Sequence, residues 1–256
     1  MGVRDSFELG GRVALITGGS RGLGLQIAKG LGEMGAKIAV SARKPGELEE
    51  AKAELKKQGI DALTVANDLS KHEQIPALIE AVVKHYGGMH ILVNNAGATW
   101  GARAEDHPLE AWNKVMSLNA TSVFALSQAV AKRCFIPQKS GSIIVIASTA
   151  ALRAGMQMQA VAYYSSKAAA LHLMRALANE WGRYNIRVNA ICPGFFPSKM
   201  AGGLLESIQA TVIAQTPLGR IGGDTDLQGA AVYLASDASR HVTGQYIAID
   251  GGASST

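Results

Sequence analysis

Aromatic residues and cysteines are scarce in this chain of 256 residues. Phe, Trp and Tyr together make up 5% of it, and its only cysteines are Cys134 and Cys192. So few aromatic residues argue against the base-stacking surfaces on which single-stranded nucleic acids bind. The two cysteines lie in different segments, without a CxxC or Cys/His ligand spacing, so we expect neither a metal site nor a disulfide framework. A reducing, cytoplasmic setting fits this cysteine usage.

Concentrated charge and long apolar runs are also missing. The 25 basic and 20 acidic residues give a formal net charge of +5, but no run of Lys or Arg exceeds two residues. Scattered charge of this kind predicts no nucleic-acid partner, while the modest positive balance favours an anionic small molecule. The first eleven residues lack the apolar centre of a signal peptide, and no apolar stretch reaches 18 residues. We therefore expect a soluble, unprocessed protein without membrane contact.

What the sequence does contain is a regular alternation of short apolar segments and amphipathic helices. This alternation, with no linker or repeat, predicts one α/β domain over residues 1–256, a doubly wound, seven-stranded, mainly parallel sheet with helices on both faces. Ser70 and Glu73 are placed to form a capping box at a helix start. Strands are expected at 13–17, 37–41, 62–66, 90–94, 141–147, 186–191 and 245–249, and helices include 46–57, a long one at 108–134, and one that begins near 163.

A glycine-rich turn follows the first expected strand. It reads Gly18-Gly19-Ser20-Arg21-Gly22-Leu23-Gly24 and leads into a helix. Glycines allow positive φ angles and a close approach of the backbone, and the helix start offers free N–H groups to a pyrophosphate. The spacing Gly-x3-Gly-x-Gly differs from the GxGxxG fingerprint, so by itself the turn is also compatible with a purely structural role.

The end of the second expected strand bears on the choice of dinucleotide. A carboxylate about 20 residues beyond the glycines would bind the ribose 2′-hydroxyl of NAD. This chain has Ser41-Ala42-Arg43-Lys44 there, without an acid. Arg43, together with Arg21 of the glycine turn, would instead bind a 2′-phosphate through charge-assisted hydrogen bonds. If a dinucleotide site exists, we expect NADP(H); the alternative is two solvated surface arginines.

Tyr163 and Lys167 lie four residues apart in a segment of strong helix formers, so they share one helix face. A phenol has an unperturbed pKa of about 10, and an ammonium within about 4 to 6 Å favours the phenolate. Such a pair is also common on helix surfaces. Ser148 follows the fifth strand and is compatible with an ordinary turn, and Asn119 lies within an apolar helical pattern, where it serves either chemistry or a bridge to neighbouring backbone.

Taken together and in order, these motifs resemble the short-chain dehydrogenase/reductase family. The resemblance spans Gly11 to Gly252. It is carried by Thr17-Gly18-x3-Gly22-x-Gly24, Asp68, Asn94-Asn95-Ala96-Gly97, Asn119, Ser148, Tyr163-x3-Lys167, Pro193-Gly194 and Asp250-Gly251-Gly252.

The resemblance implies a Rossmann-type domain with a catalytic group of Ser148, Tyr163, Lys167 and Asn119. Tyr163 would donate a proton to the substrate oxygen, which Ser148 orients. Lys167 would lower the pKa of Tyr163 and bind the nicotinamide ribose, and Asn119 would hold a water that supplies protons to Lys167. By family analogy we also expect a homotetramer with interfaces on the 108–134 helix, the Tyr163 helix and the last strand.

The cofactor site follows from the glycine turn and the resemblance. Asp68 would contact the adenine, and Asn94 and Gly97 would line the cofactor's path. The full set is Gly18, Ser20, Arg21, Gly22, Leu23, Gly24, Arg43, Asp68, Leu69, Asn95, Ala96, Gly97, Tyr163, Lys167, Pro193, Gly194, Phe196 and Ser198.

The substrate site is where the chain departs from the family pattern. The segment between Ser148 and Tyr163 has about two surplus residues, within 153–159, and a lid is expected at about 193–217. Ser148, Arg153, Phe195 and Met200 are the candidate substrate contacts. An apolar lining with basic residues at its mouth favours a medium or bulky ketone, or its alcohol, with an anionic tail. The alternatives are a sugar-acid oxidoreductase of the gluconate 5-dehydrogenase type and, from another class, a non-catalytic dinucleotide-binding sensor.

Overall fold

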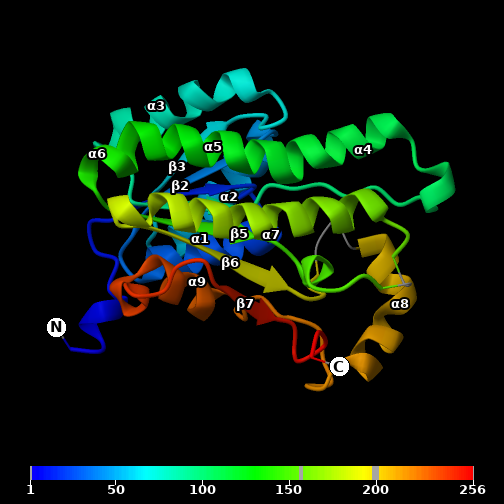
Figure 1. Ribbon diagram of the computed structural model, residues 1–256. Helices are drawn as coiled ribbons and strands as arrows, with labels where there is room; N and C mark the ends of the chain where they lie inside the picture. Colours follow the sequence, from blue (N-terminus) through cyan, green and yellow to red (C-terminus); the bar gives the residue numbers. More distant parts are fainter. Residues whose placement is uncertain (1, 156–157, 198–201, 256) are drawn as a thin grey trace.

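Helices cover both faces of a seven-stranded sheet in the computed structural model, which describes residues 2–155, 158–197 and 202–255 (Figure 1). The strand order is β3-β2-β1-β4-β5-β6-β7, and every pair is parallel. The predicted fold class is confirmed, with strand ends within one or two residues of those expected. The strands are Val13–Thr17 (β1), Lys37–Ala42 (β2), Ala62–Ala66 (β3), Ile91–Asn94 (β4), Gly141–Ile146 (β5), Ile186–Pro193 (β6) and Tyr246–Ile249 (β7).

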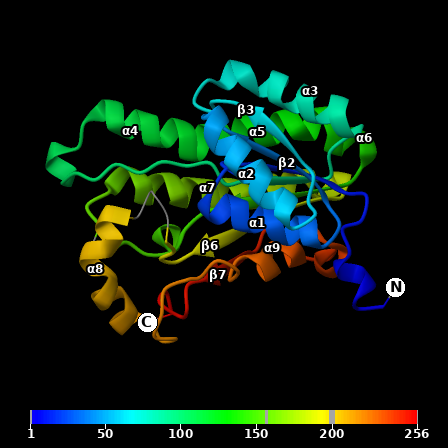
Figure 2. The same cartoon turned by 180° about the vertical axis from the view of Figure 1, so that it is seen from behind.

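Each face of the sheet has its own apolar core. Helices α3 (Ile75–Tyr86), α5 (Ser122–Val130) and α7 (Val161–Trp181) pack on one face, around a cluster that includes Leu15 and Val145. Helices α1 (Gly22–Glu33), α2 (Pro45–Lys57) and α9 (Gln228–Ala235) pack on the other (Figure 2). Because both faces are covered, the central strands consist almost entirely of buried residues, as parallel sheets require.

The long helix expected at 108–134 is interrupted twice. It begins as α4 (Leu109–Met116), widens into a π-helical segment at Ser117–Thr121, continues as α5 and, after a second π-helical segment at Ala131–Phe135, ends as α6 (Ile136–Gln138). π-helical segments are rare and often occur at functional sites. The first of them contains Asn119, whose side chain is buried as expected.

The predicted capping box at Ser70 does not form. The Ser70 N–H and hydroxyl both donate to Asp68 Oδ1, at 3.0 and 2.8 Å, so Asp68 replaces Glu73 as the local acceptor. A short 3₁₀ turn, His72–Gln74, then leads into α3, which begins at Ile75 without a side-chain cap. Pro76 lies in the first turn of α3, where a helix tolerates proline, and this favours a helix start at Ile75.

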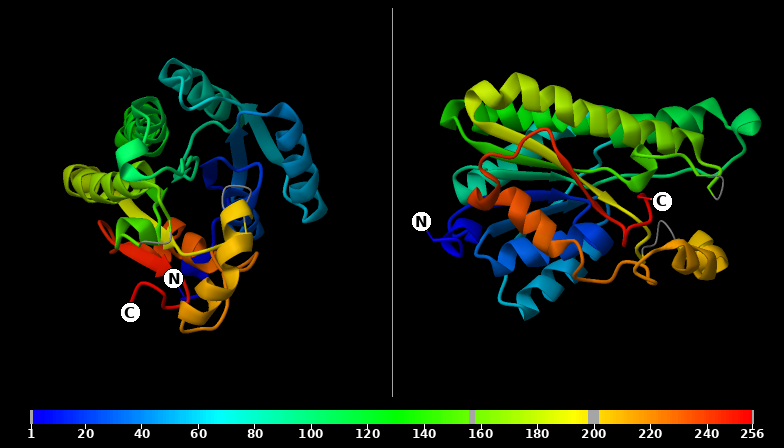
Figure 3. Two further views of the ribbon diagram at one scale, coloured as in Figure 1. Left: turned by 90° about the vertical axis from the view of Figure 1, so that its right-hand side faces the viewer. Right: turned by 60° about the horizontal axis from the view of Figure 1, so that its bottom comes forward.

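The order of the strands reverses between β1 and β4, so the crossovers on the two sides of this point leave a crevice above the carboxyl edge of the sheet. The glycine turn after β1 and the Asn94–Gly97 segment after β4 meet there. Helix α8 (Gly202–Gln215), within the expected lid, extends beyond the same edge (Figure 3). Within the described residues, none of the helices is both long and apolar enough to span a bilayer.

Candidate active site

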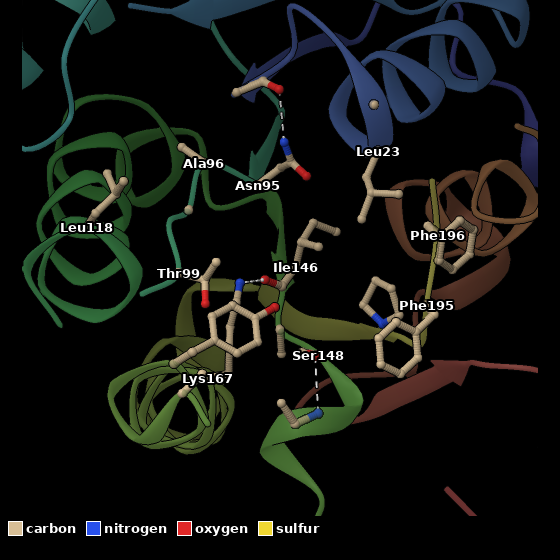
Figure 4. A pocket seen from close by; sticks show the side chains of 18 of the residues that line it. Leu23, Asn95, Ala96, Thr99, Leu118, Ile146, Ser148, Lys167, Phe195 and Phe196 are labelled. Atoms are coloured by element: carbon tan, nitrogen blue, oxygen red, sulfur yellow. Dashed lines mark hydrogen bonds between the residues drawn. The ribbon is translucent and has the colours of Figure 1, made fainter. Parts of the chain in front are cut away.

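A cavity of about 1160 Å³ occupies the crevice at the carboxyl edge of the sheet. Its walls come from the glycine turn, the exits of β2 to β6 and the loop before α7 (Figure 4). Most residues expected to bind cofactor or substrate line it. These are Gly18, Ser20, Arg21, Gly22, Leu23, Arg43, Asp68, Leu69, Asn95, Ala96, Gly97, Ser148, Arg153, Tyr163, Lys167, Pro193, Gly194, Phe195 and Phe196.

A few predicted contacts are placed elsewhere. Gly24 does not line the cavity: a Cβ on this residue would collide with the Gly18 carbonyl oxygen, so the glycine allows the helix to approach the turn. Asn94 is also turned away from the cavity, because its amide donates to Ser127 Oγ at 3.0 Å within the core. Ser198 and Met200 lie outside the described residues.

Ser148, Tyr163 and Lys167 meet at one wall of the cavity. Lys167 follows Tyr163 by one turn of α7, and its Nζ lies 5.7 Å from the centroid of the phenol ring. The Lys167 ammonium is buried and donates to the Ile146 carbonyl oxygen at 2.7 Å. Ser148 accepts the Ala150 N–H at 3.1 Å and is hydrogen-bonded to Tyr163. In Figure 4, Ser148 lies between Lys167 on the left and Phe195 on the right.

Burial dominates the electrostatics of this trio. Burial raises the pKa of Tyr163, and the hydrogen bond with Ser148 opposes this rise only in part. The Lys167 ammonium donates to the Ile146 carbonyl oxygen, and its own burial lowers its pKa to about 8. At neutral pH the geometry therefore holds a protonated phenol beside an ammonium. A protonated phenol is the form that can donate a proton.

Asn119 stands behind the cavity wall. Its Oδ1 accepts the Ala98 N–H at 2.8 Å, and its Nδ2 donates to the Ala98 carbonyl oxygen at 2.8 Å and to Ser166 Oγ at 2.9 Å. The side chain thus forms the bridge to neighbouring backbone that was left open as the alternative. The side chain does not line the cavity, but Oδ1 accepts only one N–H and keeps a second lone pair, so the expected role of Asn119 in holding a water for Lys167 stays a prediction.

A hydrogen-bond network that the sequence did not predict holds the two ligand-facing turns together. Thr17 Oγ1 accepts the N–H groups of Asn95 and Ala96, at 3.0 and 3.1 Å. The Asn95 amide in turn donates to the carbonyl oxygens of Thr17 and Gly18, at 2.9 and 3.1 Å. The Asn95 side chain therefore fixes the glycine turn to the exit of β4. In the sequence, the position of Thr17 at the end of the first strand was the feature that could have indicated this network.

The end of the cavity beside β2 is rich in positive charge. Arg21 forms an ion pair with Glu47 at 2.7 Å, and Lys44 lies 3.5 Å from the same carboxylate. Arg43 lines the cavity beside them. Gly18 and Gly22 have φ angles of 63° and 52°, the left-handed conformation that glycine adopts most readily. The open turn, the helix start of α1 and the arginines together fit a dinucleotide with a 2′-phosphate.

Further lining residues were not predicted as ligand contacts. Several follow directly from strand exits already identified, as Thr99 and Ile146 do, whereas Ala253 is brought in only by the tertiary fold. They are Glu47, Asn67, Thr99, Gly101, Ala102, Leu118, Ile146, Ala147, Thr149, Ala150, Gly155, Gln159, Ala160, Tyr164, Pro197, Asp224 and Ala253.

Comparison with known proteins agrees with this geometry. The family model described as enoyl-(acyl carrier protein) reductase matches residues 18–254. A rhamnolipids biosynthesis 3-oxoacyl-(acyl-carrier-protein) reductase of Pseudomonas aeruginosa is 40% identical over 251 residues, which cover 96% of this chain and 97% of that protein. Gluconate 5-dehydrogenase of Gluconobacter oxydans is 35% identical over 251 residues, covering 97% and 96%.

Solved structures show the same relationship. A gluconate 5-dehydrogenase from Burkholderia cenocepacia, in complex with NADP and tartrate, superposes with a TM-score of 0.93 at 35% identity, covering 98% of each chain. From its motifs, its fold and these matches, the chain belongs to the short-chain dehydrogenase/reductase family of oxidoreductases.

Proposed function

We propose that this protein is an NADPH-dependent oxidoreductase that interconverts a ketone and a secondary alcohol by hydride transfer. The observation that carries the proposal is that Tyr163, Ser148 and Lys167 line the same cavity as the glycine turn. An acid and an orienting hydroxyl therefore lie beside a site suited to a dinucleotide. A sensor that only binds the dinucleotide would not need this acid, whereas a reductase does.

NADP(H) is the cofactor that the cavity favours. Bound there, it would supply the hydride, and the protein supplies position and electrostatics. Arg43 and Arg21 would bind the 2′-phosphate; the carboxylate of Glu47 on the cavity wall is already paired with Arg21 and Lys44. The Burkholderia structure with NADP and the mannitol dehydrogenase of Alternaria alternata, named as NADP-dependent, support this choice.

The chain's own residues would act as follows. The hydroxyl of Tyr163 donates its proton to the carbonyl oxygen of the substrate while the carbonyl carbon accepts the hydride. Ser148 donates a hydrogen bond to the same oxygen and orients it. Lys167 would hold the ribose hydroxyls of the cofactor, and its charge would stabilise the phenolate that remains after proton transfer. Asn119 acts as a positioning residue, since it joins the backbone at Ala98 to Ser166 of α7.

For the substrate we propose a medium or bulky ketone with an anionic tail. The cavity beyond Ser148 is lined by apolar side chains, including Leu118, Met158 and Phe195. Arg153, an exposed residue of the wall, would meet the anionic tail. A sugar acid is the second candidate, since the Gluconobacter and Burkholderia relatives are named gluconate 5-dehydrogenases and the latter structure contains tartrate.

NADPH oxidation measured against a panel of ketones tests the proposal. The panel should contain a 3-oxoacyl thioester, 5-keto-D-gluconate and 3-quinuclidinone. Tyr163→Phe should lower the turnover number by at least about 100-fold, because proton transfer by a positioned acid contributes roughly 10² to 10⁴. The same variant should bind NADPH as tightly as the wild type in a fluorescence titration. Substantial turnover by Tyr163→Phe would refute the role of the phenol, and saturable NADPH binding without any oxidation would indicate a sensor.

A further inference from the structure

The surplus loop between Ser148 and Tyr163 is tied to α7 by the side chain of Tyr164. The Tyr164 hydroxyl accepts the N–H of Gly155 at 3.3 Å and donates to the carbonyl oxygen of the same residue at 3.1 Å. Gly155 belongs to the segment that is longer than in typical family members, and it lies outside any helix or strand. Both Gly155 and Tyr164 line the cavity.

The far end of the loop has a second attachment. The N–H of Ala102 donates to the carbonyl oxygen of Gln159 at 2.8 Å, and Ala102 and Ala160 form an isolated parallel bridge. This joins the loop to the segment that follows β4. The loop is thus fastened at Gln159–Ala160 by backbone and at Gly155 by one tyrosine hydroxyl.

The Tyr164 hydroxyl therefore pairs with both backbone polar groups of Gly155, its N–H and its carbonyl oxygen, in a loop without regular structure. Backbone N–H and C=O groups need partners, and a loop that lacks a sheet or helix ladder must find them in side chains or water. Tyr164 is adjacent to Tyr163 on a helix of 21 residues, so its hydrogen bonds fix the position of Gly155 relative to the proton donor.

We propose that Tyr164 is a positioning residue that fixes the substrate-facing wall at Arg153 and Gly155 and thereby sets the preference for bulky over small ketones. This inference rests on the proposed function. A bulky ketone reaches the wall and is oriented by it, whereas a small ketone is held by Ser148 and Tyr163 alone. Loss of the Tyr164 hydroxyl should therefore weaken the use of bulky substrates selectively.

Limited trypsin digestion tests the attachment without any need for activity. The bond after Arg153 is exposed and lies two residues before Gly155. Tyr164→Phe keeps the ring and removes both hydrogen bonds, so cleavage after Arg153, identified by mass spectrometry, should become about tenfold faster, as expected for lost hydrogen bonds of ordinary strength. Tyr184→Phe is the matched control, because the Tyr184 hydroxyl makes no hydrogen bond to the described residues.

Kinetics with NADPH then test the consequence for specificity. With 3-quinuclidinone as the bulky probe, Tyr164→Phe should raise KM about fivefold or more with kcat within about twofold, while kcat/KM for acetone stays within twofold. Equal cleavage rates in Tyr164→Phe and wild type would overturn the proposal. So would an unchanged ratio of kcat/KM for 3-quinuclidinone to kcat/KM for acetone, whether both values fall equally or neither changes. If the wild type reduces no ketone, the proposed function fails, and the digestion still decides whether Tyr164 holds the wall.

Discussion

Replacing Lys167 with methionine should stabilise the folded protein at neutral pH while it abolishes activity. The ammonium is buried, and burial lowers its pKa from the ordinary 10.5 to about 8. At about 1.4 kcal/mol per pH unit, this difference corresponds to about 3 kcal/mol of destabilisation when the lysine is charged. Methionine also loses the hydrogen bond to the Ile146 carbonyl oxygen, worth about 1 kcal/mol. The variant should therefore be about 2 kcal/mol more stable at pH 7.

The pH dependence gives this prediction its sign. Below pH 8 the lysine is protonated in both the folded and the unfolded protein, and the folded state bears the full cost of the buried charge. Between about pH 8 and 10.5 the folded state releases the proton first, so the wild type gains stability relative to Lys167→Met. The advantage of the variant should disappear by the upper end of this window.

Urea unfolding of the two proteins at several pH values measures the difference directly. Lys52→Met, at an exposed position of α2, is the control and should show no such pH-dependent gain. A Lys167→Met protein that is less stable than wild type at pH 7, or a difference that does not shrink between pH 8 and 10.5, would refute the view that the lysine is held as a costly buried cation. A loss of folding stability from a buried charge is expected at a functional site, where the charge is needed for activity.

Three further predictions concern the cofactor site and the assembly. Arg43→Asp should shift the kcat/KM ratio toward NADH by at least about tenfold, because charge-assisted hydrogen bonds contribute roughly 1.5 to 3 kcal/mol; Arg103→Asp, away from the cavity, is the control, and an unchanged ratio would mean that the 2′-phosphate is recognised elsewhere. Gly24→Ala should largely abolish NADPH binding in a fluorescence titration, because its Cβ would collide with the Gly18 carbonyl oxygen, whereas Gly46→Ala, whose Cβ meets nothing within 4 Å, should bind normally. If the homotetramer inferred from the family forms through the 108–134 segment, where Phe124 is 41% exposed, light scattering should give four times the mass of one chain; a monomeric mass would rule out this homotetramer.

The architecture could be predicted from the sequence because its signals are local and repeated. Seven apolar segments separated by amphipathic helices leave few alternatives to a parallel sheet covered on both faces, and glycines at 18 and 22 mark a turn in the left-handed conformation that glycine adopts most readily. Parallel strands also deliver their exits to one edge. Ser148, Asn95 and the glycine turn could therefore be assigned to a common site before any coordinates were known.

Other properties depended on contacts between residues far apart in the chain. The partners of Asn119 at Ala98 and Ser166 were set by the tertiary fold, and so was the direction of the Tyr163 pKa shift, because it depends on burial, which spacing on a helix does not reveal. The attachment of Gly155 to Tyr164 likewise arises only when the loop folds back on α7. Sequence determined which strand exits meet at the cavity, because strand and helix periods are local. Tertiary structure decided their protonation and partners, because desolvation and hydrogen bonding depend on everything that surrounds a group.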